Sequence, residues 1–245
     1  MAKRRGVGFA GDVSGNYSRN ELEEGDFLPS NYLLLSNIGA QGAVIFSSQE
    51  DYDRFEAYLY LLNAIESPRA SNFFLDDRNS DIFSVARGDL LVAIGAYSFS
   101  PKGFLILVRE LAPKGIAKFM QKVQTAYTMY FNGKYQRHGR IFHSGYRADI
   151  AQSDAHLKYL VAMVHMHPAV LFNPHWEEAA ELELRVLANR VAEYRYSSFG
   201  EYVARKFCIL SPEHFPKYCS AARDAEALLS QWKKGVQFVQ KGNRK

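Results

Sequence analysis

Short apolar runs alternate with amphipathic segments in the first part of this 245-residue chain. The run NYLLLSN (31–37) ends near two glycines and is followed by AVIF (43–46), a pattern typical of two short strands. Ser47 and Ser48 then precede residues 51–65, in which apolar side chains recur every three to four positions. This spacing predicts a helix with a serine cap.

The middle of the chain predicts a hairpin and a long helix. Two apolar runs, 90–99 and 104–110, lie on either side of Ser100-Pro101-Lys102-Gly103, which indicates two antiparallel strands joined by a tight turn. Residues 115–131 repeat apolar positions at helical spacing, and we expect Asn132-Gly133 to end that helix.

The last part of the chain predicts helices only. Residues 154–166 form a helical pattern that Pro168 ends, 177–194 form a second, and the segment from Ala222 begins as a third before it becomes a basic tail. The whole order, strand, strand, helix, hairpin and then helices, is typical of an α+β fold with an antiparallel sheet.

The same patterns suggest how the chain is divided. Residues 1–28 mix Gly, Ser, Asn and charge without periodicity, and we interpret them as a flexible arm. Residues 29–205 form the main domain, with 66–88 as a polar loop insertion, and residues 206–245 form a helical extension that ends in a basic tail.

Composition narrows the function classes. There are 30 Lys and Arg against 26 Asp and Glu, a net charge of +4, and only two cysteines, Cys208 and Cys219, which have no metal-ligand spacing. No apolar signal region and no apolar run of about 20 residues is found, so no membrane partner is expected. We therefore expect a cytoplasmic protein, associated with the nucleoid or with a ribonucleoprotein.

The positive charge concentrates in residues 114–147, which contain seven Lys or Arg and no Asp or Glu. Cations interleaved with aromatic rings are typical of surfaces that bind a phosphate backbone and stack bases. We predict that this segment, together with Lys102, binds nucleic acid. The candidate residues are Lys102, Lys114, Lys118, Lys122, Tyr127, Asn132, Lys134, Arg137, His138, Arg140, His143, Tyr146 and Arg147.

The same segment resembles a signature of the REP-associated tyrosine transposases, an IS200-like family of HUH single-strand DNA transposases. In that family a helix reading roughly FMQKL…YTxYFN runs into KYxRxGxLFQGRYKA, and this chain reads KFMQKV…YTMYFN and KYQRHGRIFHSGYR. The resemblance extends more weakly over 31–202. It implies a ferredoxin-like, HUH-type central sheet with packed helices, and a single-stranded or hairpin DNA, or a structured RNA, as partner.

The resemblance also implies where catalytic residues would lie, and this chain has other residues there. Two histidines of the family's PNHFHLL strand hold a divalent metal, but the matching positions here are Gly103 and Leu105, which have no ligand atom. The nucleophilic tyrosine of YIHLNP corresponds to Met163, whose thioether cannot attack phosphorus. We therefore expect no catalytic residue, no metal and no cofactor.

The sequence offers no clear substitute for the metal ligands or for the nucleophile. His165 and His167 lie two positions apart on a helix, about 200° around its axis, so we interpret them as packing or capping residues and not as metal ligands. Tyr127 lies between the apolar stripe and the lysines of its helix, so the sequence leaves both packing and base stacking open. We expect stacking.

Three functions remain open. Our preferred hypothesis is a transposase-derived nucleic-acid-binding protein without catalytic activity. The alternatives are an active metal-dependent nuclease or transposase with a relocated site, and a structural scaffold subunit of a larger nucleoprotein or protein assembly. The sequence does not decide whether the protein forms a homodimer or a larger assembly.

Overall fold

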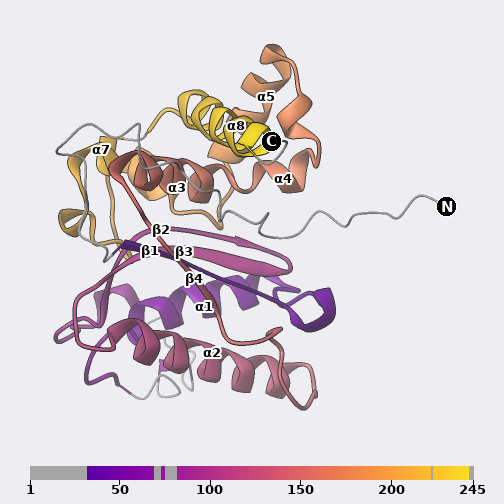
Figure 1. The fold of residues 1–245 in the computed structure, drawn as a ribbon. Helices are drawn as coiled ribbons and strands as arrows, with labels where there is room; N and C mark the ends of the chain where they lie inside the picture. The colour runs from indigo at the N-terminus through magenta and orange to yellow at the C-terminus, as the bar shows by residue number, and fades with distance from the viewer. Residues whose placement is uncertain (1–31, 69–72, 75–81, 222, 243–245) are drawn as a thin grey trace.

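A four-stranded antiparallel sheet lies in the middle of the protein, between two layers of helices (Figure 1). The computed structural model describes residues 32–68, 73–74, 82–221 and 223–242. The predicted arm at 1–28 and residues 69–72 and 75–81 of the predicted insertion lie outside this range. The described part of the insertion includes a short 3-10 helix, η3 (Ile82–Ser84).

The order of elements up to the fourth strand is that of a ferredoxin-like fold. Along the chain it runs β1 (Tyr32–Ile38), α1 (Gln49–Leu61), β2 (Val92–Ser100), β3 (Gly103–Glu110), α2 (Gly115–Lys134) and β4 (Arg147–Ile150). In the sheet the strand order is β2-β3-β1-β4, and the three neighbouring pairs are antiparallel. The prediction of an α+β fold with this sheet is confirmed.

Side chains of the central strands alternate between two hydrophobic cores. In β3, Phe104 and Ile106 pack with α1 and α2 on one face, while Leu105 and Leu107 pack with the helices on the other. Successive residues of a strand point to opposite faces, so a strand covered on both sides is apolar throughout. This explains the nearly continuous apolar run that the sequence shows at 104–108.

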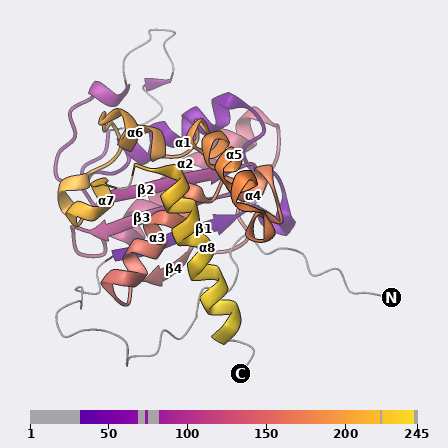
Figure 2. The same cartoon turned by 90° about the horizontal axis from the view of Figure 1, so that it is seen from above.

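The second helical layer comes from the C-terminal part of the chain. Its elements are α3 (Asp154–Met166), α4 (Ala169–Phe172), η4 (Trp176–Glu178), α5 (Glu181–Ala192), α6 (Phe199–Ala204), η5 (Pro212–His214), α7 (Lys217–Ala221) and α8 (Ala225–Gly242). Figure 2 shows α8 crossing above the sheet beside α3. The rings of Trp176 and Trp232 stack 4.1 Å apart and tie α8 to this layer. The predicted C-terminal extension thus shares its core with α3.

Several predicted boundaries are wrong. AVIF (43–46) is not a strand: it follows a short 3-10 helix, η1 (Ala40–Gly42), and the amides of Ile45 and Phe46 both donate to the carbonyl of Pro101. Two amides that share one carbonyl cannot continue a ladder. The helix predicted to end at Asn132-Gly133 continues to Lys134, because a glycine does not by itself leave the helical conformation.

The two ends of the sheet differ, and this decides where the candidate residues lie. The turn between β2 and β3, at Pro101 and Lys102, marks one end, which we call the hairpin-turn end. Because β3 leads away from that turn, α2 begins at the opposite end and returns. With 20 residues, α2 is about 30 Å long.

Candidate nucleic-acid interface

The loop that follows α2 lies at the hairpin-turn end. Its His143 amide donates to the carbonyl of Ile38 at 2.8 Å, and the Ala40 amide donates to the carbonyl of Ile141 at 2.8 Å. The Gly39 amide donates to the carbonyl of Lys102, also at 2.8 Å. These backbone bonds bring the loop, the end of β1 and the hairpin turn together.

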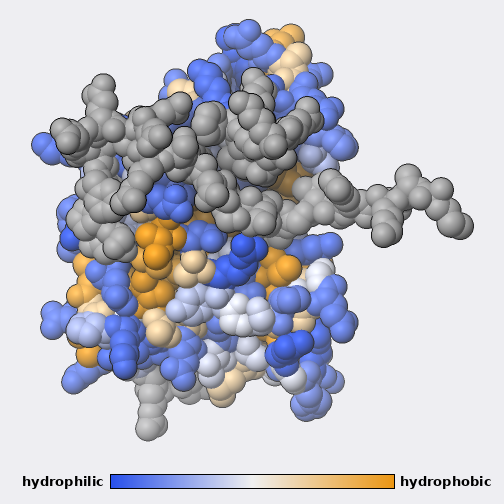
Figure 3. Space-filling model, viewed as in Figure 1, coloured by the Kyte–Doolittle hydropathy of each residue, from blue (hydrophilic) through white to orange (hydrophobic). Residues whose placement is uncertain are grey.

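Six candidate residues share this end, and all six are exposed. We call them the basic end. They are Lys102, Arg137, His138, Arg140, His143 and Arg147. Among the described residues, none of their side chains makes an ion pair. Figure 3 shows a mostly hydrophilic surface over the α2 layer, with hydrophobic patches nearer the sheet. Four fixed cations without carboxylate partners are suited to binding phosphates.

A buried carboxylate holds the start of this loop in place. Asp51, at the first turn of α1, is fully buried. It accepts hydrogen bonds from Ser47 N (2.7 Å), Ser48 N (2.9 Å), Tyr130 Oη (2.9 Å), Lys134 Nζ (2.8 Å) and Tyr135 Oη (2.7 Å). This role of Asp51 is not evident from the sequence. The S-x-x-D spacing signals a helix cap, but no local pattern connects Asp51 with residues some eighty positions later.

The charges around Asp51 reinforce one another. Burial alone would raise the pKa of Asp51, but the bonds from Lys134, Tyr135, Ser47 and Tyr130 hold it below its ordinary value. Burial would likewise lower the pKa of Lys134, and the bonds to Asp51 and its neighbours instead raise it well above the ordinary value. Lys134 also lies 2.9 Å from Glu50. Lys134 is therefore bonded within the protein, and its contact with nucleic acid stays a prediction.

Asn132 and Tyr146 shape the loop from inside. Asn132 Nδ2 donates to the carbonyl of Gly139 at 2.8 Å. Gly139 has a φ of +87°, a left-handed conformation that glycine adopts without strain. Tyr146 is half-buried and packs against the core under α2, and burial raises its pKa. Both side chains support the loop more than they present a surface.

The lysines on α2 do not belong to the basic end. Lys114 and Lys118 are exposed, but they lie near the start of α2, most of the helix length away from Arg137. Lys122 Nζ donates to the carbonyls of Ala64 (2.7 Å) and Ile65 (3.2 Å), at the end of α1. The expectation of one continuous surface from 114 to 147 is therefore wrong.

Tyr127 is a core residue, so the prediction that it stacks on a base is wrong. Its side chain is 0% exposed, its ring contacts Phe46 and Phe55, and its hydroxyl donates to the carbonyl of Ile45. Burial raises its pKa far above the ordinary value. Helix phase left the direction open, and the aromatic cluster beneath α2 decides it.

The three positions at which the sequence resemblance implies catalytic residues lie on, or packed against, one face of the sheet. Leu105 and Met163 both belong to the core between the sheet and α3, and Gly103 lies two residues before Leu105 on the same face. Leu105 is 2% exposed and Met163 8%. Hydrocarbon and thioether packing fills the place, so these residues do not fit a hard divalent cation.

His165, in α3, and His167, its C-terminal cap, are packing residues, as predicted. His165 is fully buried against the rings of Phe199 and Tyr202, and its Nδ1 lies 3.4 Å from Ser198 Oγ. Burial lowers the pKa of His165 to about 3. His167 is 7% exposed and lies near Trp232. A neutral, enclosed imidazole of this kind contributes packing, and it cannot act as an acid at neutral pH.

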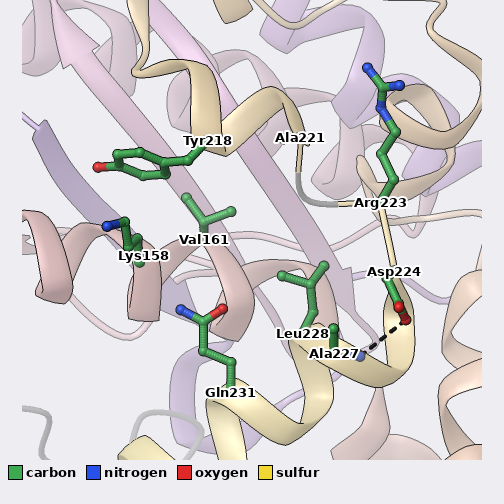
Figure 4. Close-up of a pocket in the computed structure, with 9 residues that line it drawn as sticks. All are labelled: Lys158, Val161, Tyr218, Ala221, Arg223, Asp224, Ala227, Leu228 and Gln231. Carbon is green, nitrogen blue, oxygen red and sulfur yellow. Dashed lines mark hydrogen bonds between the residues drawn. The ribbon is translucent and has the colours of Figure 1, made fainter.

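A pocket of about 250 Å³ lies far from the basic end, between α3, α7 and α8. Figure 4 shows Leu228 and Val161 at its floor, with Lys158 and Gln231 at its sides and the Arg223 side chain directed away. Lys158 pairs with Asp154 at 2.7 Å and lies 4.7 Å from the Tyr218 ring. Its charge is thus already used within the protein.

The part of the chain that the structure describes contains neither a candidate metal site nor a candidate membrane-spanning helix. No group of three or more His, Cys, Asp or Glu side chains there is arranged to hold a metal ion. None of the described helices combines the length and the apolar character that a bilayer crossing needs.

Comparison with known proteins gave one structural likeness. No protein-family model matches the sequence, and no curated protein matches it. Among solved structures, the fold is similar to that of a REP-associated tyrosine transposase bound to a REP hairpin, with a TM-score of 0.46 and 9% sequence identity. The likeness covers 77% of this chain and 88% of that chain.

Proposed function

We propose that this protein binds single-stranded or hairpin nucleic acid through the basic end and does not cut or join it. The observation that carries the proposal is that Lys102 of the hairpin turn meets Arg137, Arg140 and Arg147 of the segment after α2 at one end of the sheet. None of these side chains forms an ion pair with another described residue. The sequence signature at 114–147, to which three of these four cations belong, favours the same ligand class.

The loop is held in a fixed shape, which favours binding over a general solvation role. Asp51 fixes its first residues, and backbone bonds to Ile38 and Ala40 fix its last ones. A pre-shaped surface loses little conformational entropy when a ligand binds. Solvated lysines on long, unrestrained loops do not have this advantage.

The proposal that the protein is inactive rests on the side chains that fill the face of the sheet covered by α3. Gly103 offers no donor atom, and Leu105 and Met163 are enclosed in apolar packing. A metal site needs deprotonated or neutral donor atoms at about 2.0–2.3 Å from the ion. Neither side-chain rotation nor a small shift of the backbone supplies one here.

Fluorescence anisotropy with labelled DNA and RNA hairpins tests the binding proposal. The double variant Arg140→Ala/Arg147→Ala should lose at least tenfold in affinity at about 0.1 M salt. Its dependence of log affinity on log salt should be shallower by about 1.4 for a single strand, because each lost phosphate contact removes about 0.7. The matched control Lys114→Ala/Lys118→Ala removes the same charge from the other end of α2 and should bind like the wild type.

Equal losses in the two double variants would contradict the proposal, since net charge and not the basic end would then control affinity. Absence of salt-dependent binding to any hairpin would favour the scaffold alternative. The nuclease alternative is tested separately, by incubating the protein with labelled hairpins and Mg²⁺ or Mn²⁺. Specific nicks or a covalent adduct that survives denaturation would establish it.

A further inference from the structure

A buried tyrosine joins two carboxyl groups that belong to different parts of the fold. The Tyr97 hydroxyl, on β2, lies 3.0 Å from Glu201 Oε1 of α6 and 3.4 Å from Glu56 Oε1 of α1. Tyr97 is only 4% exposed, and both glutamates are partly buried. The three side chains therefore connect α1, the sheet and the C-terminal layer at one point.

The number of hydrogens that the Tyr97 hydroxyl can donate decides whether one of the two glutamates must be protonated. A phenol has one hydrogen, so Tyr97 can donate to one carboxylate and not to two. The shorter contact assigns that hydrogen to Glu201. The second contact is a hydrogen bond only if Glu56 carries a proton and donates it to the Tyr97 oxygen. With both carboxylates ionised, one of them faces the phenol oxygen without a hydrogen between them.

The surrounding charges also favour one bound proton. Asp53 lies one turn before Glu56 on α1, and Arg195, the nearby cation, pairs with Asp53 at 2.8 Å. Burial, followed by Asp53, raises the pKa of Glu56 to about 7, with Arg195 opposing the shift. Burial also raises the pKa of Glu201, whose other oxygen accepts from the Cys208 amide at 2.7 Å. The guanidinium of Arg195 thus pairs with Asp53 and only partly offsets the raised pKa of Glu56.

This contact lies beside a segment that closes the outer edge of β2. Residues 194–201 run along that edge, where the Phe99 amide donates to the Tyr196 carbonyl at 2.9 Å and the Ser198 amide donates to the Tyr97 carbonyl at 2.9 Å. Ser198 Oγ accepts from the Tyr97 amide at 2.8 Å. The segment thus satisfies backbone groups that an edge strand otherwise leaves open.

We propose that Glu56, Tyr97 and Glu201 form a proton-dependent clasp that holds residues 194–201 on the edge of β2. The clasp is closed while the two carboxyl groups share one proton, and it loosens when both are ionised, because two adjacent carboxylates repel and only one can be bonded. The inference is independent of nucleic-acid binding.

The sign of the pH effect follows from Glu56. Its pKa in the folded protein, about 7, lies above the ordinary value of 4.5, so the folded state holds the proton more tightly than the unfolded state. The stability that the proton supplies is complete below about pH 4.5 and is lost as the pH rises through 7. His165 on α3, which faces Ser198, has a pKa of about 3, and Tyr52, Tyr194 and Tyr196 have raised pKa values. None of these four groups changes charge in the folded protein between pH 5 and 8.5. His165 takes up a proton on unfolding below about pH 6.5, which makes stability rise with pH there, opposite to the effect of Glu56.

A carboxyl titration followed by NMR on ¹³C-labelled protein tests the clasp without any substitution. We expect one glutamate to titrate near pH 7, and its signal to be absent in Glu56→Gln. If the signal that Glu56→Gln removes titrates near pH 4.5 in the wild type, no proton is shared and the proposal is overturned.

Thermal unfolding between pH 5 and 8.5 gives the second measurement. Glu56→Gln keeps His165, and its amide can always donate to Tyr97, so the difference between the two proteins isolates the proton of Glu56. Relative to the melting temperature of Glu56→Gln, that of the wild type should fall as the pH rises through 7, and the variant should melt higher than the wild type at pH 8. Glu193→Gln removes the same charge from an exposed side chain and should keep the wild-type dependence. An unchanged dependence in Glu56→Gln would overturn the proposal.

Hydrogen exchange locates the opening. After correction for the intrinsic pH dependence, the amides of Phe99 and Ser198 should lose protection as the pH passes 7. The amides of β3, which is paired on both sides, should not. If protection at the edge falls no more than in β3, then ionisation does not loosen residues 194–201, and the clasp is disproved.

Discussion

The helical and loop halves of the basic segment carry the same sign of charge but use it differently. In the helix, residues 115–134, Lys122 binds carbonyls just after α1, and Lys134 binds carboxylates of α1. Lys118 is exposed, but it lies in the half of the helix that is far from the basic end. In the loop and its continuation, 135–147, the cations stay exposed and converge with Lys102. Charge along a sequence therefore indicates a binding surface only where the fold leaves it without an internal partner.

The strongest test of this contrast is Tyr127→Ala, in the helical half. Removing a fully buried aromatic ring leaves a cavity and should lower the free energy of unfolding by about 4 kcal/mol. Urea denaturation measures the loss, and hairpin affinity is measured at a temperature where the variant is folded. Affinity should be unchanged. Unchanged stability together with weakened binding would contradict the assignment of Tyr127 to the core and would favour base stacking.

Asp51→Asn separates the support of the loop from its cations. The substitution leaves Lys134 without its buried partner and should cost about 3 kcal/mol of stability at neutral pH. Because the pKa of Asp51 is held below its ordinary 3.8, its contribution is present above that value and lost as the pH falls through the folded pKa. The advantage of the wild type over Asp51→Asn should begin to decline below about pH 4 and should disappear only when the pH is below the folded pKa. An advantage that persists at lower pH would show that the carboxylate charge is not what holds the loop.

Lys122→Met keeps the aliphatic chain and removes the ammonium that binds the carbonyls just after α1. The lost bonds to Ala64 and Ile65 should cost about 1 kcal/mol, with no effect on hairpin affinity. Chemical denaturation and anisotropy on the same sample check both statements. A weakened affinity at unchanged stability would extend the interface along α2.

Lys102→Ala should give the smallest effect. Its side chain is exposed at the hairpin turn, so stability should change by less than about 0.5 kcal/mol. Affinity for a hairpin should fall severalfold, with a salt dependence shallower by about 0.7 for a single strand. The same affinity and slope as the wild type would restrict the basic end to the loop and β4.

The sequence predicted the fold better than the interface. Apolar alternation and turn residues identified β1, the hairpin and α2, because strand and helix periods are local properties. It also placed α3 at the residues where it is found, since Ser153 caps the helix and Pro168 follows it. AVIF failed because its pairing depends on a single carbonyl, that of Pro101, more than fifty residues away in the sequence.

The interface was predicted only in part, and the reason lies in distant contacts. Arg137, Arg140 and Arg147 were placed correctly on the surface, because a loop without apolar period is normally exposed. The hydrogen bond from Lys122 to the carbonyl of Ala64 and the ion pair of Lys134 with Asp51 each join residues that are more than fifty positions apart. Helix phase also left Tyr127 on a boundary that only the packed core resolves.

The order in which the two faces of the sheet are covered matters during synthesis of the protein. The face in question is the one that α3 and the other C-terminal helices cover. Its apolar side chains, among them Leu34, Leu105 and Leu107, are covered by helices that all follow β4 in the chain. Because the N-terminal part leaves the ribosome first, the ferredoxin-like unit is complete while this face still lacks its cover. Until α3 emerges, the nascent chain exposes this hydrophobic surface, which is of the kind that makes chaperones necessary. Fragments that end before Asp154 are therefore expected to aggregate.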